Sequence, residues 1–195
     1  MNFLGISNSY TNKEWVGPSK QDLQQTSLYS KRLSIPQISA YQLIKNNIKE
    51  EDYFDYVSPK IKNLIPNPKI FLDMEKGALR LMKAIEQEET IAIFADYDVD
   101  GTVSAALISL WLGNFSIEPK VYIPDRESEG FGPNSEAMNK LSLKNSLIIC
   151  VDCGTDSEAA IREATNRGAD VIVIDHHRSE TFSKAAYAVI NPNRF

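Results

Sequence analysis

The sequence predicts an α/β protein, in which a mostly parallel sheet is flanked by helices and preceded by a helical or irregular N-terminal segment. Apolar runs of strand length alternate with segments of helical periodicity from residue 71 onward. This alternation is typical of parallel strands joined by right-handed crossovers. Three of the apolar runs also finish directly in aspartate, namely Ile91–Ala95 before Asp96, Leu147–Val151 before Asp152 and Val171–Ile174 before Asp175.

Residues 1–70 are predicted to be an N-terminal arm followed by a short helical segment. Met1–Leu33 is polar and weakly patterned, which predicts an extended arm. Ile35–Ile48 places apolar residues on one side and predicts a short helix. Prolines and asparagines over residues 58–68 indicate turns and loops.

Residues 71–195 are predicted to form the α/β domain itself. Asp73–Glu88 has apolar residues at helical spacing, and Asp73 is suited to cap that helix. Beyond the first strand, the pattern predicts helices over 102–112, 134–141 and 156–167, strands over 120–123 and 186–190, and a turn-rich loop over 124–134.

The composition is that of an ordinary globular protein, and it excludes few classes of function. Of its 195 residues 43% are hydrophobic, and no apolar run approaches the ~20 residues that cross a bilayer. The N-terminus lacks a basic region followed by an apolar core, so a cytoplasmic protein without a membrane partner is expected. A net charge of −5 neither requires nor excludes a nucleic-acid ligand.

Cys150 and Cys153 have the C-x-x-C spacing of a redox pair or of half a zinc site. Cys150 lies inside an apolar run, however, and the chain has no second cysteine pair. Buried, reduced cysteines are therefore favoured.

Acidic residues and the chain's two histidines gather just past the predicted strand ends. In an open α/β sheet, ligand sites form outside the carboxyl ends of the strands, which would bring Asp96, Asp98, Asp152 and His176 to one crevice. Hard carboxylate oxygens together with imidazole suit a pair of Mn²⁺ or Mg²⁺ ions better than a structural zinc. The alternative is that these are loop aspartates, one of which caps the following helix.

These residues belong to three motifs in order, DYDVDG at 96–101, VDCG at 151–154 and DHH at 175–177. With them the chain resembles the DHH phosphoesterase superfamily. The segments YIPDRESEGFGPN at 122–134 and FLDMEKGALRLMKAI at 71–85 are similar to the RecJ-type branch of single-stranded-DNA-specific exonucleases. The resemblance covers residues 15–195.

The resemblance implies a role for each motif residue. The ligands of two divalent cations, Mn²⁺ or Mg²⁺, would be Asp96, Asp98, Asp152 and His176, with Asp152 between the two ions. His177 would lie close to the scissile phosphate and Asp175 would orient a histidine. Asp100 would brace its turn, and Arg126 would contact a phosphate unless it is an ordinary solvated loop arginine.

The function implied by the resemblance is metal-dependent hydrolysis of phosphodiesters in single-stranded DNA, from the 5′ end, in DNA repair and recombination. Two cations would hold the phosphodiester and activate a water, so that no protein nucleophile is needed. Two alternatives stay open: a small phosphoesterase acting on short oligonucleotides or nucleotides, and a non-catalytic interaction module that keeps the fold.

Two departures from the family pattern qualify this expectation. Ala92 stands where some branches of the superfamily carry a histidine. Family members also continue beyond the third motif to a fourth acidic motif and a second, substrate-binding lobe, and the sequence ends before both. The chain is therefore expected to be an N-terminal portion with little activity alone, and the sequence leaves open whether a separate C-terminal chain completes the enzyme.

Overall fold

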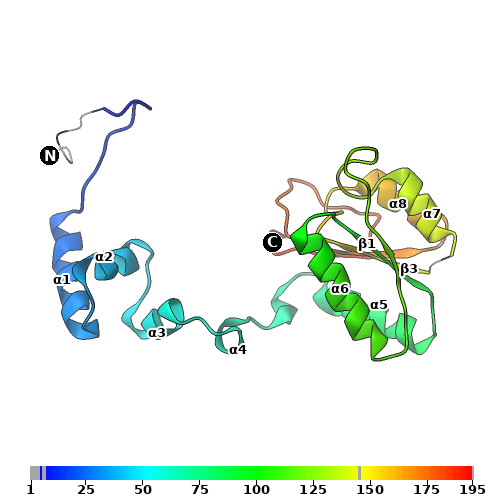
Figure 1. Cartoon of the computed structure of the whole chain (residues 1–195), viewed down its shortest axis with the longest axis horizontal. Coiled ribbons are helices and arrows are strands. Elements are labelled where there is room, and N and C mark those ends of the chain that lie inside the picture. Colours follow the sequence, from blue (N-terminus) through cyan, green and yellow to red (C-terminus); the bar gives the residue numbers. More distant parts are fainter. Residues whose placement is uncertain (1–4, 6–7, 145, 195) are drawn as a thin grey trace. The chain divides into compact units, whose positions relative to one another are not determined.

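The computed structural model describes residues 5, 8–144 and 146–194. The chain folds as two compact units, Met1–Pro66 and Asn67–Phe195 (Figure 1). Among the described residues, no helix combines the length and the apolar character needed to span a membrane.

The described part of the N-terminal unit is helical from Lys20 onward, which corrects the prediction of an extended arm over Met1–Leu33 for its second half, while residues 1–4 and 6–7 of that arm lie outside the described residues. Its elements are α1 (Lys20–Leu33), α2 (Gln37–Lys45), a 3₁₀ turn η2 (Glu50–Asp52), α3 (Tyr53–Val57) and α4 (Ile61–Leu64). A capping box starts α1, because Ser19 accepts from the Asp22 N–H while Asp22 accepts from the Ser19 N–H. Packing of α1 against α2 then supplies the stabilisation that the weak apolar pattern did not reveal.

The C-terminal unit is built on a five-stranded, fully parallel sheet. Its strands are β1 (Ile91–Ala95), β2 (Lys120–Tyr122), β3 (Leu147–Val151), β4 (Asp170–Ile174) and β5 (Ala188–Ile190), in the order β2-β1-β3-β4-β5. The register aligns the last residues of neighbouring strands, since Ala95 pairs with Val151, Val151 with Ile174, and Ile174 with Ile190. The predicted parallel sheet is thus confirmed.

Helices cover both faces of this sheet (Figure 1). One face packs against α7 (Ser135–Ser142) and α8 (Glu158–Asn166), and the other against α5 (Met74–Glu86) and α6 (Val99–Gly113). Successive strand residues alternate between the two cores, with Phe94 in one and Ile93 in the other. Cys150 and Cys153 are buried free thiols in the first core, as expected, and burial raises the pKa of both.

Two helix starts differ from those predicted. Asp73 precedes α5 with a φ of 59° but makes no capping hydrogen bond; its carboxylate instead accepts from the Val189 N–H and from Arg194. α6 begins at Val99, three residues earlier than expected, because the Asp98 carboxylate caps it by accepting from the Gly101 N–H. The first-motif acids therefore lead directly into the helix, since Asp98 is its N-cap and Asp100 lies in its first turn.

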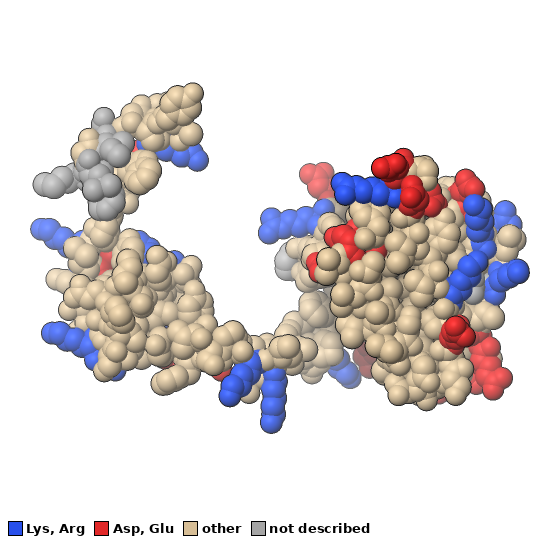
Figure 2. Space-filling model, viewed as in Figure 1, with Lys and Arg blue, Asp and Glu red and all other residues tan. Residues whose placement is uncertain are grey.

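The outer side of α6 is unusually apolar. Val99, Val103, Leu107, Leu110 and Trp111 are all exposed, by 42–75% of their surface. Beside them, an apolar groove of ≈ 290 Å³ is lined by residues of α5 and α6 together with Ile172 and Ile174 of the sheet. In Figure 2 the surface over α6 is uncharged apart from acidic side chains at its N-terminal end.

Candidate metal centre

The strand register places four polar residues in one row at the carboxyl edge of the sheet. Asp96, Asp152, Asp175 and Asn191 each follow the last residue of a strand, and these last residues are paired across β1, β3, β4 and β5. Backbone hydrogen bonds continue the ladder one residue further, as the Asp152 N–H donates to Ile174 and the Asp175 N–H to Ile190. The row is therefore fixed by the sheet itself.

The first motif wraps its acids around a tight turn. Asp96 is 3% exposed, and its carboxylate accepts from the Tyr97 N–H at 2.8 Å. Asp98 is held by the Gly101 N–H at 3.0 Å. Gly101 is required here, because a Cβ at this position would lie 2.4 Å from the Asp96 carbonyl oxygen.

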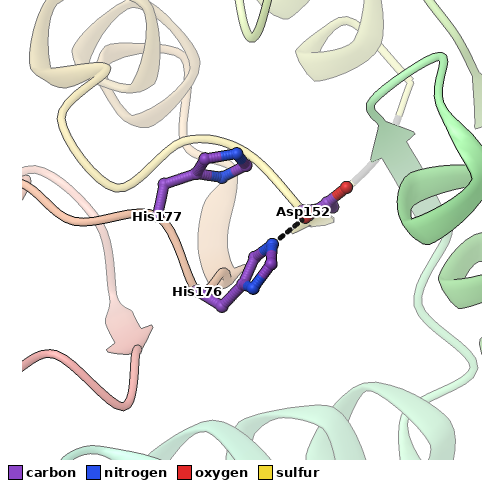
Figure 3. A group of neighbouring side chains, drawn as sticks. All are labelled: Asp152, His176 and His177. Atoms are coloured by element: carbon purple, nitrogen blue, oxygen red, sulfur yellow. Dashed lines mark ion pairs between the residues drawn. The ribbon is translucent and has the colours of Figure 1, made fainter. Parts of the chain in front are cut away.

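Asp152 lies at the centre of the cluster. Its backbone has a φ of 60°, a left-handed conformation that aspartate tolerates better than most residues. One carboxylate oxygen, Oδ1, lies 3.0 Å from His176 Nε2 (Figure 3). The other oxygen, Oδ2, is buried and receives no hydrogen bond from any residue that the structure describes.

Two groups of potential ligand atoms meet at Asp152. Asp96, Asp98 and Asp152 each offer an atom within 4.8 Å of the others, and so do Asp152, His176 and His177. Buried, unpaired carboxylate oxygens are costly unless a cation satisfies them. Oxygen-rich ligand sets with imidazole fit Mn²⁺ or Mg²⁺, so these residues fit the predicted cations, with Asp152 shared between the two groups.

The electrostatics of the cluster agree with this reading. Burial, followed by the adjacent Asp98 carboxyl, raises the pKa of Asp152 to about 6. The Gly101 N–H holds the pKa of Asp98 below its ordinary value. Packing carboxyls together at this cost is the arrangement that a bound divalent ion relieves.

Asp175 orients the two histidines. It is 7% exposed, and its Oδ1 accepts from the N–H groups of His176 and His177 and contacts His177 Nδ1 at 2.8 Å, while Oδ2 accepts from the Thr155 N–H. Burial alone would raise the pKa of Asp175, but hydrogen bonds from Thr155 and His177 hold it below its ordinary value. The Asp175 carboxylate in turn raises the pKa of His177.

Two aromatic residues to which the motifs gave no role contact predicted site residues, namely Tyr97 in the first motif and Phe131 in the loop between β2 and α7. The Arg126 guanidinium lies over the Tyr97 ring at 5.5 Å, and the Phe131 ring meets His177 edge to face at 5.5 Å. In the sequence, the only sign of these two contacts was the presence of Tyr97 and Phe131 inside the segments 96–101 and 122–134. Arg126 is exposed, so its role as a phosphate contact stays a prediction.

Asp100 faces a neighbouring cleft. This cleft, of ≈ 390 Å³, is lined by Asp100, Asp152, Asp175 and His176 together with apolar residues of α6 and Ile174. Asp100 lies in the first turn of α6 and is exposed. It is outside both groups of potential ligand atoms, and its role in supporting the turn stays a prediction.

Glu158 anchors the segment that follows the histidines. Its Oε2 accepts from Ser183 Oγ and from the N–H groups of Lys184 and Ala185, and Arg162 pairs with its other oxygen. These hydrogen bonds, that from Ala185 first, lower the pKa of Glu158 to about 2. The returning segment between His177 and β5 is therefore tied to α8.

Replacement of Glu158 by Gln is expected to destabilise the fold in a pH-dependent way. Because the folded-state pKa is depressed, ionised Glu158 contributes stability that is fully present above its ordinary pKa of 4.5 and is lost as pH falls through about 2. Urea unfolding should therefore show a deficit for Glu158→Gln at pH 7 that shrinks below pH 4.5. Glu163→Gln, on the exposed side of α8, is the control. A deficit independent of pH would contradict the assignment.

Comparison with known proteins identifies the domain. The family described as "DHH family, N-terminal domain" matches residues 90–195. The single-stranded-DNA-specific exonuclease RecJ of Bacillus subtilis is 37% identical over 122 residues, which are 62% of this chain and 16% of that protein. RecJ of Escherichia coli is 32% identical over 135 residues, or 68% of this chain and 23% of its own length.

A crystal structure of exonuclease RecJ bound to manganese superimposes with a TM-score of 0.56 at 31% identity, covering 60% of this chain and 30% of that one. The chain thus spans less than a third of each of these relatives. The family signature nevertheless covers more than half of the chain, and it includes all three motifs with their acids and histidines. The chain belongs to the DHH family.

Proposed function

We propose that the chain is the metal-holding lobe of a RecJ-type exonuclease, which hydrolyses phosphodiester bonds of single-stranded DNA with two divalent cations, Mn²⁺ or Mg²⁺. RecJ proteins that are 37% and 32% identical to it are named single-stranded-DNA-specific exonucleases. The observation that carries the proposal is the cluster at the sheet edge, where Asp152 joins two ligand groups and keeps a buried oxygen that accepts no hydrogen bond from the described residues.

The ligand residues explain why substrate binding should depend on metal. Without cations, the carboxylates of Asp96, Asp98 and Asp152 repel a phosphodiester. When bound, two divalent cations supply Lewis-acid stabilisation of the phosphoryl oxygens and an activated water. Asp152, which belongs to both groups, is proposed as the shared ligand.

His177 and Arg126 are proposed to contact the phosphodiester. With His177 Nδ1 directed at Asp175, its Nε2 is the ring nitrogen left for a phosphate oxygen. Tyr97 lies inside the first motif, DYDVDG at 96–101. The Arg126 guanidinium lies over the Tyr97 ring, so a cationic side chain stands at the edge of the ligand cluster. Asp175 would orient His177, and Asp100 would support the first turn of α6.

A separate polypeptide, equivalent to the rest of a RecJ relative, is proposed to complete the enzyme. This chain spans only 16% and 23% of the two RecJ relatives, which carry most of their residues outside the matched region. The exposed apolar stripe of α6 and the groove beside it are suited to bury against such a polypeptide. The chain alone is then expected to cleave DNA weakly.

The test is digestion of a 5′-labelled single-stranded oligonucleotide with Mn²⁺. The chain is assayed alone and with the remaining portion of B. subtilis RecJ supplied as a second polypeptide. We expect little cleavage by the chain alone, and Mn²⁺-dependent degradation from the 5′ end by the mixture, lost with Asp152→Ala. A 3′-labelled strand and a duplex of the same sequence serve as substrate controls.

Three outcomes would revise the proposal. Robust degradation by the chain alone would show that no second polypeptide is needed. Turnover of dinucleotides without cleavage of long strands would favour the small phosphoesterase. Binding of the second polypeptide with no cleavage of any phosphodiester would favour the non-catalytic interaction module.

A further inference from the structure

The fourth residue of the row at the sheet edge is an asparagine, which the three-motif pattern does not account for. Asn191 follows β5 as Asp96, Asp152 and Asp175 follow β1, β3 and β4, and it is fully buried at 0% exposure. A buried amide at this position must be satisfied by hydrogen bonds. The hydrogen-bond partners of the Asn191 amide indicate its structural role.

Asn191 joins the second motif to the third. Its side-chain N–H₂ donates to Thr155 Oγ1 at 2.9 Å and to the His177 carbonyl oxygen at 2.9 Å. The Thr155 N–H donates in turn to Asp175 Oδ2 at 3.1 Å. A closed ring of contacts therefore runs from Asp175 through Thr155 and Asn191 to His177.

Asn193 extends this network to the other histidine. Its side-chain N–H₂ donates to the His176 carbonyl oxygen at 2.7 Å, while its backbone N–H donates to Asn191 Oδ1 at 2.8 Å. The carbonyl groups of both histidines are thus held by the side-chain amides of Asn191 and Asn193. The segment N-P-N at 191–193 therefore forms a clamp, which holds the backbone carbonyls of His176 and His177.

The histidines need such a clamp because they lie outside regular secondary structure. β4 ends at Ile174, and both His176 and His177 are exposed. Without fixed carbonyls, their backbone would retain conformational freedom, and the loss of that freedom when a ligand binds would weaken binding. An aspartate at 191 or 193 would repel these carbonyls, so an amide donor is the chemistry required.

We propose that Asn191 and Asn193 are positioning residues of the metal centre, which hold the His176–His177 backbone so that His176 Nε2 meets Asp152 and His177 Nδ1 meets Asp175. The inference rests on the proposed metal centre, but the geometry of the clamp can be measured without metal. Supporting residues of this kind typically change metal affinity by about 10–100-fold when they are removed.

The experiment uses Asn193→Ala as its main variant, because Asn191 is fully buried and its replacement risks the fold. Mn²⁺ binding to the whole chain is followed by the electron paramagnetic resonance signal of free Mn²⁺. We expect Asn193→Ala to weaken Mn²⁺ binding about tenfold. Asn114→Ala is the matched control, since the Asn114 amide also donates to a carbonyl, that of Trp111, but at the far end of α6.

A double-mutant cycle separates positioning from general destabilisation. If Asn193 acts through His176, then Asn193→Ala should have no further effect on Mn²⁺ affinity in a His176→Ala background. An equal loss in both backgrounds, or no loss in either, would overturn the inference.

A metal-free measurement distinguishes failure of the clamp from failure of the proposed function. The imidazole rings of His176 and His177 are 4.8 Å apart between centroids, which should give nuclear Overhauser contacts between them. We expect these contacts in the wild type and in Asn114→Ala, and their loss in Asn193→Ala. Contacts that persist in Asn193→Ala would overturn the clamp, even if the wild-type chain bound no Mn²⁺.

Discussion

Asp152→Asn is expected to weaken Mn²⁺ binding by more than about 100-fold, beyond the range typical of residues that only support ligands. Asp152 is the one residue shared by both groups of potential ligand atoms in the described part of the chain. The substitution keeps the shape of the side chain but removes its charge, so both groups lose an anionic oxygen. Isothermal titration with Mn²⁺ measures the loss.

The same variant is expected to be at least as stable as the wild type when metal is absent. Burial and the Asp98 carboxyl raise the pKa of Asp152 to about 6, which means that ionising this carboxyl costs more free energy in the folded chain than in the unfolded one. An amide removes that penalty. Opposite effects on metal affinity and on stability are the signature of a residue retained for binding.

Asp156→Asn is the control, because Asp156 is exposed and lies only four residues along the chain. It should leave both Mn²⁺ affinity and thermal stability near the wild-type values. Wild-type Mn²⁺ affinity in Asp152→Asn would remove Asp152 from the metal centre.

Gly101→Ala is expected to destabilise the C-terminal unit by about 3 kcal/mol or more, the upper range of overpacking. Its added Cβ would lie 2.4 Å from the Asp96 carbonyl oxygen and 2.8 Å from the Asp96 Cβ. Backbone atoms at the end of a central strand cannot move away without breaking the sheet edge. Equilibrium urea unfolding measures the change, and loss of Mn²⁺ binding should accompany it.

Gly113→Ala provides a control within the same helix. Gly113 is the last residue of α6, and a Cβ there would meet no atom within 4 Å. Alanine in a helix is favoured over glycine by about 1 kcal/mol, so Gly113→Ala should be neutral or slightly stabilising. If Gly101→Ala were also neutral or stabilising, close packing of the turn against Asp96 would not hold.

Local patterns in the sequence were enough to predict the sheet and the acids at its edge. The runs Ile91–Ala95 and Leu147–Val151 are apolar on both faces, which is the mark of a buried parallel strand, and each finishes in an aspartate. These runs become strands of the sheet because burying their apolar side chains on both faces is favourable. Their carboxyl ends then meet at one edge, so the meeting of Asp96 and Asp152 follows from chain direction alone.

The helix α1 shows where local patterns failed. Its apolar signal is weak, and the prediction of an extended arm was therefore wrong over Lys20–Leu33. The capping box at Ser19 and Asp22 was readable in the sequence. The packing of α1 against α2 was not, because contact between two amphipathic segments depends on the turn that joins them.

By itself, the sequence determined the fold class, the three motifs and the residues offered to a cation. Only the tertiary structure showed that Asn191 occupies the fourth place in the row, that Phe131 contacts His177 and that Arg126 lies over Tyr97. These contacts join residues far apart in the chain, and side-chain periodicity carries information only about neighbours along it. Strand register and loop path, set by packing of the whole unit, decided which distant side chains meet.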